Sequence, residues 1–276
     1  MPLHVNYTFL NNATIILDCL TSSDLQTARR LYEDVMHLDG GINYQKIDSV
    51  DTLRKVLSRI KVDCSKGMLP IIHIEAHGDS NKGIQVGDKK DVFSWKELVD
   101  SLREINILTK NNTVVILAAC EGLYAILQIR IFQPTPFAFL IGSQDKISAG
   151  DLDKHMVKFY STLVKTGSAA VAMKEIPDRM QLFHSEQFFL IAIGRHFKQY
   201  MGKRFLKNTE QMISKTRRFH NRHSLRELRA ALKPELKPSQ ARFAEYARKF
   251  LHGKITVEFE DFMAFLRGEL RNNTPR

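Results

Sequence analysis

The stretches that decide the fold are PIIHIEAHGD, residues 70–79, and TVVILAACEG, residues 113–122. Each begins with an apolar run of the length of a buried strand and then turns polar. His77 follows the first run and Cys120 follows the second. In an open α/β sheet, ligands and reacting groups gather at the carboxyl ends of the strands. The two stretches therefore predict such a sheet with a His and a Cys at its carboxyl edge, the reactive pair of a cysteine hydrolase.

Strands and helices alternate around these two stretches. Further buried strands are expected over residues 13–20, 42–47 and 136–142, and helices over 25–38, 50–60, 95–105, 123–130 and 151–166. Residues 83–93 resemble a hairpin. This alternation predicts a three-layer α/β fold with a mainly parallel central sheet. After residue 179 the pattern is helical only, so we predict a boundary near residue 180 between a 1–180 domain and a 181–276 helical region.

The length of 276 residues suits one large domain, or one domain with a helical extension. No apolar run approaches the ~20 residues of a membrane span, and the first residues lack the pattern of a secretory signal. The chain has three cysteines, too few for a disulfide framework. We interpret Cys19 and Cys64 as structural thiols, and we expect a cytoplasmic protein with reduced cysteines.

The positive charge is concentrated in the last third of the chain. Residues 195–276 contain 20 Lys and Arg against 8 Asp and Glu, a net +12, which leaves −1 for the rest of a chain of net charge +11. Such a region could bind nucleic acid, anionic lipid or an acidic partner, or it could be a solvated helical surface. No recognised nucleic-acid motif surrounds its densest cluster, Arg217–His223, so nucleic acid is the less favoured partner.

The spacing of His77 and Cys120 suits nucleophilic catalysis. A thiol with an ordinary pKa of about 8.5 is mostly protonated at neutral pH, and a neighbouring imidazole can accept its proton. Gly78 has no Cβ, so the N–H groups of Gly78 and Cys120 could together form an oxyanion hole. Gly122 would relieve crowding behind the nucleophile. A buried structural thiol and an unrelated histidine are the alternative, but their matching contexts favour a catalytic pair.

These segments resemble those of the caspase-like cysteine peptidases, most closely the CHAT group. The strand 139–143 and the helix end 159–167, followed by residues 170–173, resemble later motifs of that family, so the resemblance covers about residues 12–180. It implies peptide-bond hydrolysis, with Cys120 as the nucleophile, His77 as the general base, and the Gly78 and Cys120 amides as oxyanion donors. It also implies a protein substrate and regulated proteolysis, as in bacterial anti-phage defence or cell death.

Two features depart from the family pattern. About 14 residues separate Gly122 from the next expected strand, which leaves no long processing linker of the executioner-caspase kind. The basic last third has no counterpart, and we expect it to gate activity, recruit an activating protein or bind a small-molecule ligand. The alternative is a catalytically silent caspase-fold scaffold whose basic helices bind a partner or nucleic acid. No cofactor is expected.

Substrate preference requires a pocket residue. Asp145 follows the strand 136–142, and a carboxylate there would select Arg or Lys before the cut bond, although it could equally cap a turn. Asp79, beside His77, is the second candidate. His73 and Glu75 share one strand face with His77 and could orient it from beneath. A strand interior gives a metal ion little access, so no metal site is expected.

Overall fold

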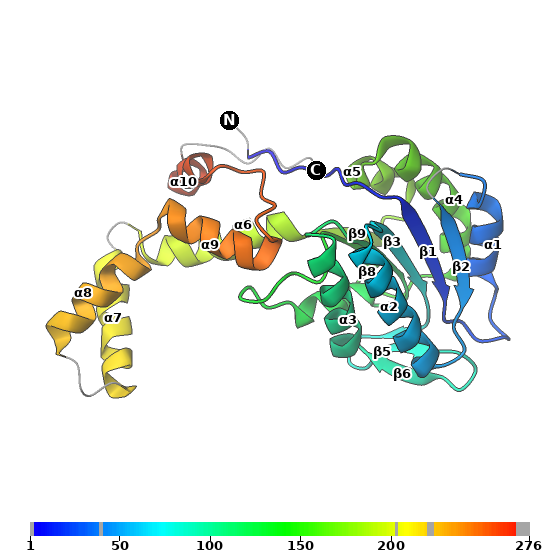
Figure 1. The fold of residues 1–276 in the computed structure, drawn as a ribbon, viewed down its shortest axis with the longest axis horizontal. Helices are drawn as coiled ribbons and strands as arrows, with labels where there is room; N and C mark the ends of the chain where they lie inside the picture. Colours follow the sequence, from blue (N-terminus) through cyan, green and yellow to red (C-terminus); the bar gives the residue numbers. More distant parts are fainter. Residues whose placement is uncertain (1–2, 39–40, 202–203, 220–223, 269–276) are drawn as a thin grey trace. The chain divides into compact units, whose positions relative to one another are not determined.

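The computed structural model describes residues 3–38, 41–201, 204–219 and 224–268 (Figure 1). The chain divides into two compact units. The first, here called the α/β unit, comprises residues 6–185 and 250–254. The second, the helical unit, comprises the described parts of residues 1–5, 186–249 and 255–276. The main division lies between Ser185 and Glu186, a few residues after the boundary predicted near residue 180. Residue 180 is the first residue of a strand that belongs to the α/β unit.

A six-stranded sheet forms the centre of the α/β unit, in the order β2-β1-β3-β7-β8-β9. The first five of these strands run parallel and β9 runs antiparallel to β8. Their bounds are Ala13–Asp18 (β1), Ile42–Lys46 (β2), Pro70–Glu75 (β3), Val114–Ala118 (β7), Phe139–Ser143 (β8) and Met180–His184 (β9). The predicted α/β class with a mainly parallel sheet is thus confirmed.

The expectation of helices only beyond residue 179 was wrong, because β9 is an edge strand of mixed polarity. Its five residues, MQLFH, are too few and too polar to give a periodic signal. Pairing along the whole of β8 fixes the strand instead. At its end the ring of His184 stacks on Phe139, with ring centroids 4.6 Å apart.

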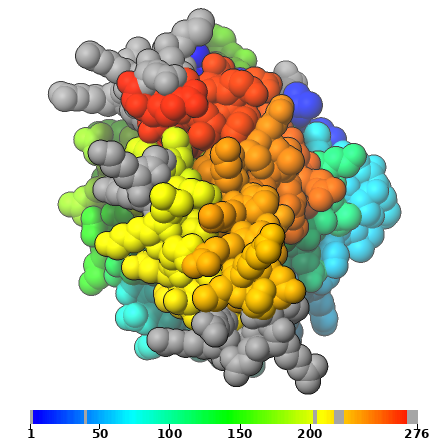
Figure 2. All heavy atoms as spheres, turned by 90° about the vertical axis from the view of Figure 1, so that its left-hand side faces the viewer, coloured from blue at the N-terminus to red at the C-terminus, as the bar shows by residue number. Residues whose placement is uncertain are grey.

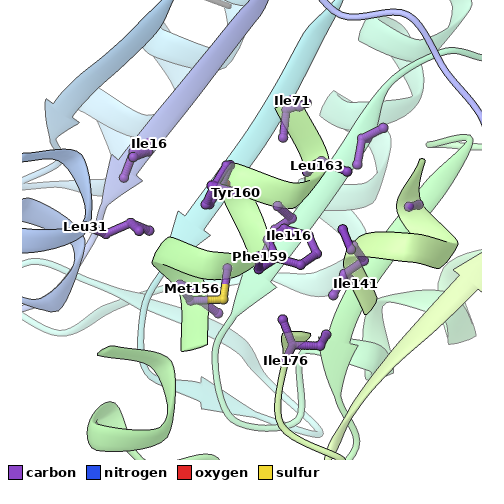
Figure 3. Close-up of a cluster of buried hydrophobic side chains, with 14 of the residues drawn as sticks. Ile16, Leu31, Ile71, Ile116, Ile141, Met156, Phe159, Tyr160, Leu163 and Ile176 are labelled. Atoms are coloured by element: carbon purple, nitrogen blue, oxygen red, sulfur yellow. The ribbon is translucent and has the colours of Figure 1, made fainter. Parts of the chain in front are cut away.

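Helices cover both faces of the sheet (Figure 1). Helices α2 (Val50–Ser65) and α3 (Trp95–Leu108) pack together on one face, and α1 (Thr27–Val35) and α4 (Ala149–Thr166) on the other. Figure 3 shows the core under α4, where Met156 and Tyr160 meet Ile16 and Ile116 of the sheet. Two short turns, α5 (Ala169–Ala172) and η2 (Met173–Glu175), follow α4.

A small second sheet lies between β3 and α3 in the chain. It has the order β4-β5-β6, formed by Gly78–Asp79, Gly83–Val86 and Asp91–Ser94. The predicted hairpin supplies β5 and β6, and the unpredicted β4 starts directly after His77. The helix expected over 123–130 is a 3-10 helix, η1 (Gly122–Gln128).

Five helices run through the described part of the helical unit: α6 (Ser185–Gln199), α7 (Arg204–Phe219), α8 (Leu225–Leu236), α9 (Gln240–Leu251) and α10 (Phe259–Arg267); the first residue of α6 and the last two of α9 belong to the α/β unit. Figure 2 shows the surfaces of α7 to α10, coloured yellow to red. Aromatic rings fill its core, where Phe243 stacks on Phe262 with centroids 5.1 Å apart. Residues 220–223 of the basic cluster lie outside the described residues. Among the helices that the structure describes, none has the length and apolarity to cross a bilayer.

Candidate functional site

The sheet brings His77 and Cys120 to the same edge. In the parallel pair of β3 and β7, Glu75 lies opposite Ala118, and His77 and Cys120 each follow two residues later. Both line one open cleft of about 210 Å³. The cleft lies where the strand order reverses, since the chain moves from β1 outward to β2 and then back to β3. Open α/β sheets bind their ligands at such a switch point.

Cys120 is the accessible thiol of the three cysteines. Cys19 and Cys64 are buried, and burial raises the pKa of each thiol to about 12. They are therefore protonated and unreactive at neutral pH. Cys120 is partly exposed, and its thiol lies 3.7 Å from the carbonyl oxygen of Ile147, to which it donates a weak hydrogen bond.

Asp24 is the partner of the His77 imidazole, with Nε2 and Oδ2 3.0 Å apart. The carboxylate of Asp24 also accepts hydrogen bonds of 2.8 Å from the amide and the hydroxyl of Thr21. Burial alone would raise the pKa of Asp24, but the hydrogen bonds from Thr21 and His77 outweigh it and lower the pKa below its ordinary value. The side chain is thus an ionised anchor for the imidazole, joining residues from the ends of β1 and β3.

The thiol and the imidazole lie in one cleft without contacting each other. Among the described residues, each binds a different acceptor, Ile147 for Cys120 and Asp24 for His77. Catalytic hydrogen bonds are often long or unformed without substrate and tighten when it binds. In this structure the two side chains are thus held by separate partners rather than by each other.

Glu121 fixes the turn that carries Cys120. Its backbone is left-handed, with φ of +57°, a conformation that costs a non-glycine residue about 1–2 kcal/mol. Its amide donates a 3.1 Å hydrogen bond to the carbonyl of Asp145, and its carboxylate accepts one from the amide of Ser80. These bonds connect the loops after β4, β7 and β8 and offset the cost of the turn.

Two glycines of the motif are required by packing. A Cβ on Gly78 would lie 1.9 Å from the carbonyl oxygen of Cys120, and a Cβ on Gly122 would lie 2.9 Å from the Cβ of Leu117. The contact with Leu117 agrees with the expectation that Gly122 relieves crowding behind Cys120. Gly78 thus lies close to the backbone carbonyl of Cys120, and the role of the two amides as oxyanion donors stays a prediction.

The two carboxylates expected to select substrate do not line the cleft. Asp79 caps a turn instead, and its Oδ1 accepts hydrogen bonds from the amides of Asn81 and Lys82. The side chain of Asp145 is exposed, and only its backbone reaches the site, through Glu121. Substrate recognition by either residue stays a prediction.

His73 and Glu75 form a buried polar layer beneath the pair, as their shared strand face predicts. The Nδ1 of His73 lies 2.9 Å from the hydroxyl of Tyr160, and Glu75 accepts a hydrogen bond from the hydroxyl of Thr27. Within the described residues, no three His, Cys, Asp or Glu side chains gather as metal ligands.

Sequence reasoning missed Asp24 and Glu121. Asp24 lies in the segment between β1 and α1, at the same carboxyl edge of the sheet as His77 and Cys120. No protein-family model matches the chain, and no curated protein matches it. A function must therefore be inferred from the chemistry of the residues that line the cleft.

Proposed function

We propose that this protein is a cysteine endopeptidase with a caspase-like α/β unit, in which Cys120 is the nucleophile and His77 the general base. One observation carries the proposal: the two side chains end adjacent parallel strands and line the same cleft. The mainly parallel six-stranded sheet is compatible with the fold that the sequence resemblance implies.

In the proposed reaction His77 accepts the proton of the Cys120 thiol, and the sulfur attacks the carbonyl carbon of the cut bond. The amides of Gly78 and Cys120 stabilise the oxyanion of the tetrahedral intermediate. When the C–N bond breaks, the imidazolium gives its proton to the leaving amine and a thioester remains on Cys120. Water, deprotonated by His77, then attacks the thioester and releases the acid product and the free thiol.

Asp24 acts as a positioning residue in this scheme. Its ionised carboxylate holds Nε2 of His77, which fixes the plane of the ring and favours the imidazolium that forms during attack. The ring nitrogen Nδ1 is then the one available to exchange a proton with Cys120.

The resting contact of Cys120 with Ile147 suggests how activity is regulated. Ile147 lies in the segment between β8 and α4, so a ligand or protein that moves this segment would release the thiol. The contact that such a movement breaks is weak, because a thiol is a poor hydrogen-bond donor.

The test is proteolysis of unfolded casein, with new termini mapped by mass spectrometry, for the wild type, Cys120→Ala and His77→Ala. We expect fragments from the wild type alone, with all three proteins equally folded by circular dichroism. Fragments that persist with Cys120→Ala would refute the assignment. An intact casein with every protein, together with a Cys120 inert toward peptide electrophiles, would favour the silent scaffold.

A further inference from the structure

The lining of the cleft combines apolar walls with negative charge. Its apolar walls come from Leu20, Leu25, Ala118, Ala119 and Leu152. Its carboxylates are Asp24 and Glu75, and no Lys or Arg of the described residues joins them. Asp24 is already engaged by His77. Glu75 is therefore the carboxylate of the lining that does not contact His77.

Glu75 lies beneath the reacting pair. It is the last residue of β3, and His77 follows two residues later in the chain, so both line the cleft at the end of this strand. The Glu75 side chain is only 4% exposed. Behind it, lined also by Thr27 and Leu152, is a cavity of about 10 Å³, close to the least volume that holds one water.

The carboxylate of Glu75 has little compensation for its burial. One oxygen accepts a hydrogen bond from Thr27, and the other lies 3.5 Å from Nε2 of His73, a buried nitrogen that makes no hydrogen bond among the described residues. The nearby Lys46 is committed to Asp18, at 3.1 Å. A buried charge is costly unless it is paired, so the site favours a ligand that brings a cation.

We propose that the cleft is the pocket for the residue before the cut bond and that it selects Lys or Arg through Glu75. This inference rests on the proposed peptidase function. The methylene stem of the basic residue packs on the apolar walls while its charged end reaches the carboxylate. The same preference was expected from Asp145 or Asp79, but their side chains lie outside the lining.

The test measures covalent labelling of Cys120 by two peptidyl acyloxymethyl ketones that differ only in the residue before the reactive carbonyl, arginine or the uncharged, unbranched norleucine. Rates are read by intact-protein mass spectrometry. For the wild type we expect the arginyl probe to react roughly 10- to 100-fold faster, the range for a hydrogen bond to a charged group. For Glu75→Gln we expect the two rates to agree within about threefold, because the arginyl rate falls much more than the norleucyl rate.

Asp145→Asn is the matched control, and it should keep the wild-type preference. A second variant, Glu75→Asp, keeps the charge on a side chain that is one methylene shorter. Its preference for the arginyl probe should lie between those of the wild type and Glu75→Gln. Equal slowing of both probes by Glu75→Gln would make Glu75 a structural residue and overturn the inference. Loss of the preference in Asp145→Asn would do the same. If neither probe labels the wild type, the peptidase proposal itself fails; if both label it equally, only the pocket assignment fails.

Discussion

Replacing Asp24 with Asn tests whether His77 is held for catalysis. The substitution keeps the size of the side chain but removes the charge that faces Nε2 of His77 at 3.0 Å. It also weakens the two hydrogen bonds that the carboxylate accepts from Thr21. We therefore expect the imidazole to lose its fixed orientation while the cleft and the thiol stay in place.

The size of the effect follows from the exposure of the two partners. A hydrogen bond to a charged group contributes about 1.5–3 kcal/mol. Here the side chains of His77 and Asp24 are 49% and 26% exposed, so screening by water reduces that contribution. A loss of about 1–2 kcal/mol of transition-state stabilisation corresponds to a factor of roughly 5–30 in rate.

The assay is the turnover of a peptide substrate by Asp24→Asn, with kcat and KM determined separately. We expect kcat to fall by roughly 5- to 30-fold with KM nearly unchanged, because Asp24 acts through His77 rather than on the substrate. Asp88→Asn is the control, since Asp88 holds the same loop through the amide of Ser22, at 2.6 Å, without touching His77. A kcat within twofold of the wild type for Asp24→Asn, or an equal loss in Asp88→Asn, would refute the reasoning.

Three further predictions follow from the α/β unit. Iodoacetamide at pH 7.5 should modify Cys120 well before the two buried cysteines, whose pKa values of about 12 keep them protonated; peptide mapping that finds equal labelling would contradict this. Gly78→Ala should lower stability by about 1–3 kcal/mol in urea unfolding, because its Cβ would meet the carbonyl of Cys120 at 1.9 Å; Gly150→Ala should not, because its Cβ would meet only Ser148 Oγ at an ordinary contact distance of 3.9 Å. Burial, with a smaller contribution from Lys254, lowers the pKa of His184 to about 4. Between pH 6.5, the ordinary pKa of a histidine in the unfolded chain, and pH 4, the unfolded chain binds a proton on His184 and the folded chain does not. The free energy of unfolding should therefore decrease by up to ~3 kcal/mol as the pH is lowered from 6.5 to 4, and His184→Phe should flatten this dependence on pH.

The sequence predicted best where apolar runs mark strands buried on both faces. The runs before His77 and Cys120 located β3 and β7, and the parallel arrangement then placed both side chains at one edge. The strand β9 was not predicted, because its stability comes from pairing with β8 rather than from its own sequence pattern.

Long-range contacts account for what the sequence left unpredicted at the site. Asp24 and His77 are 53 residues apart, and only the adjacency of β1 and β3 brings them together. Asp145 follows the expected strand but faces solvent, because its loop binds Glu121 through the backbone instead. Loop direction depends on such hydrogen bonds, and a strand pattern does not encode them.

The most direct test of the peptidase proposal is the rate at which an arginyl acyloxymethyl ketone labels Cys120 in the wild type and in His77→Ala. We predict one adduct per chain, mapped to Cys120, and labelling at least roughly tenfold slower in His77→Ala, because the imidazole no longer accepts the thiol proton. Equal rates in the two proteins, or an adduct on another residue, would contradict the assignment of His77 and Cys120 as a catalytic pair.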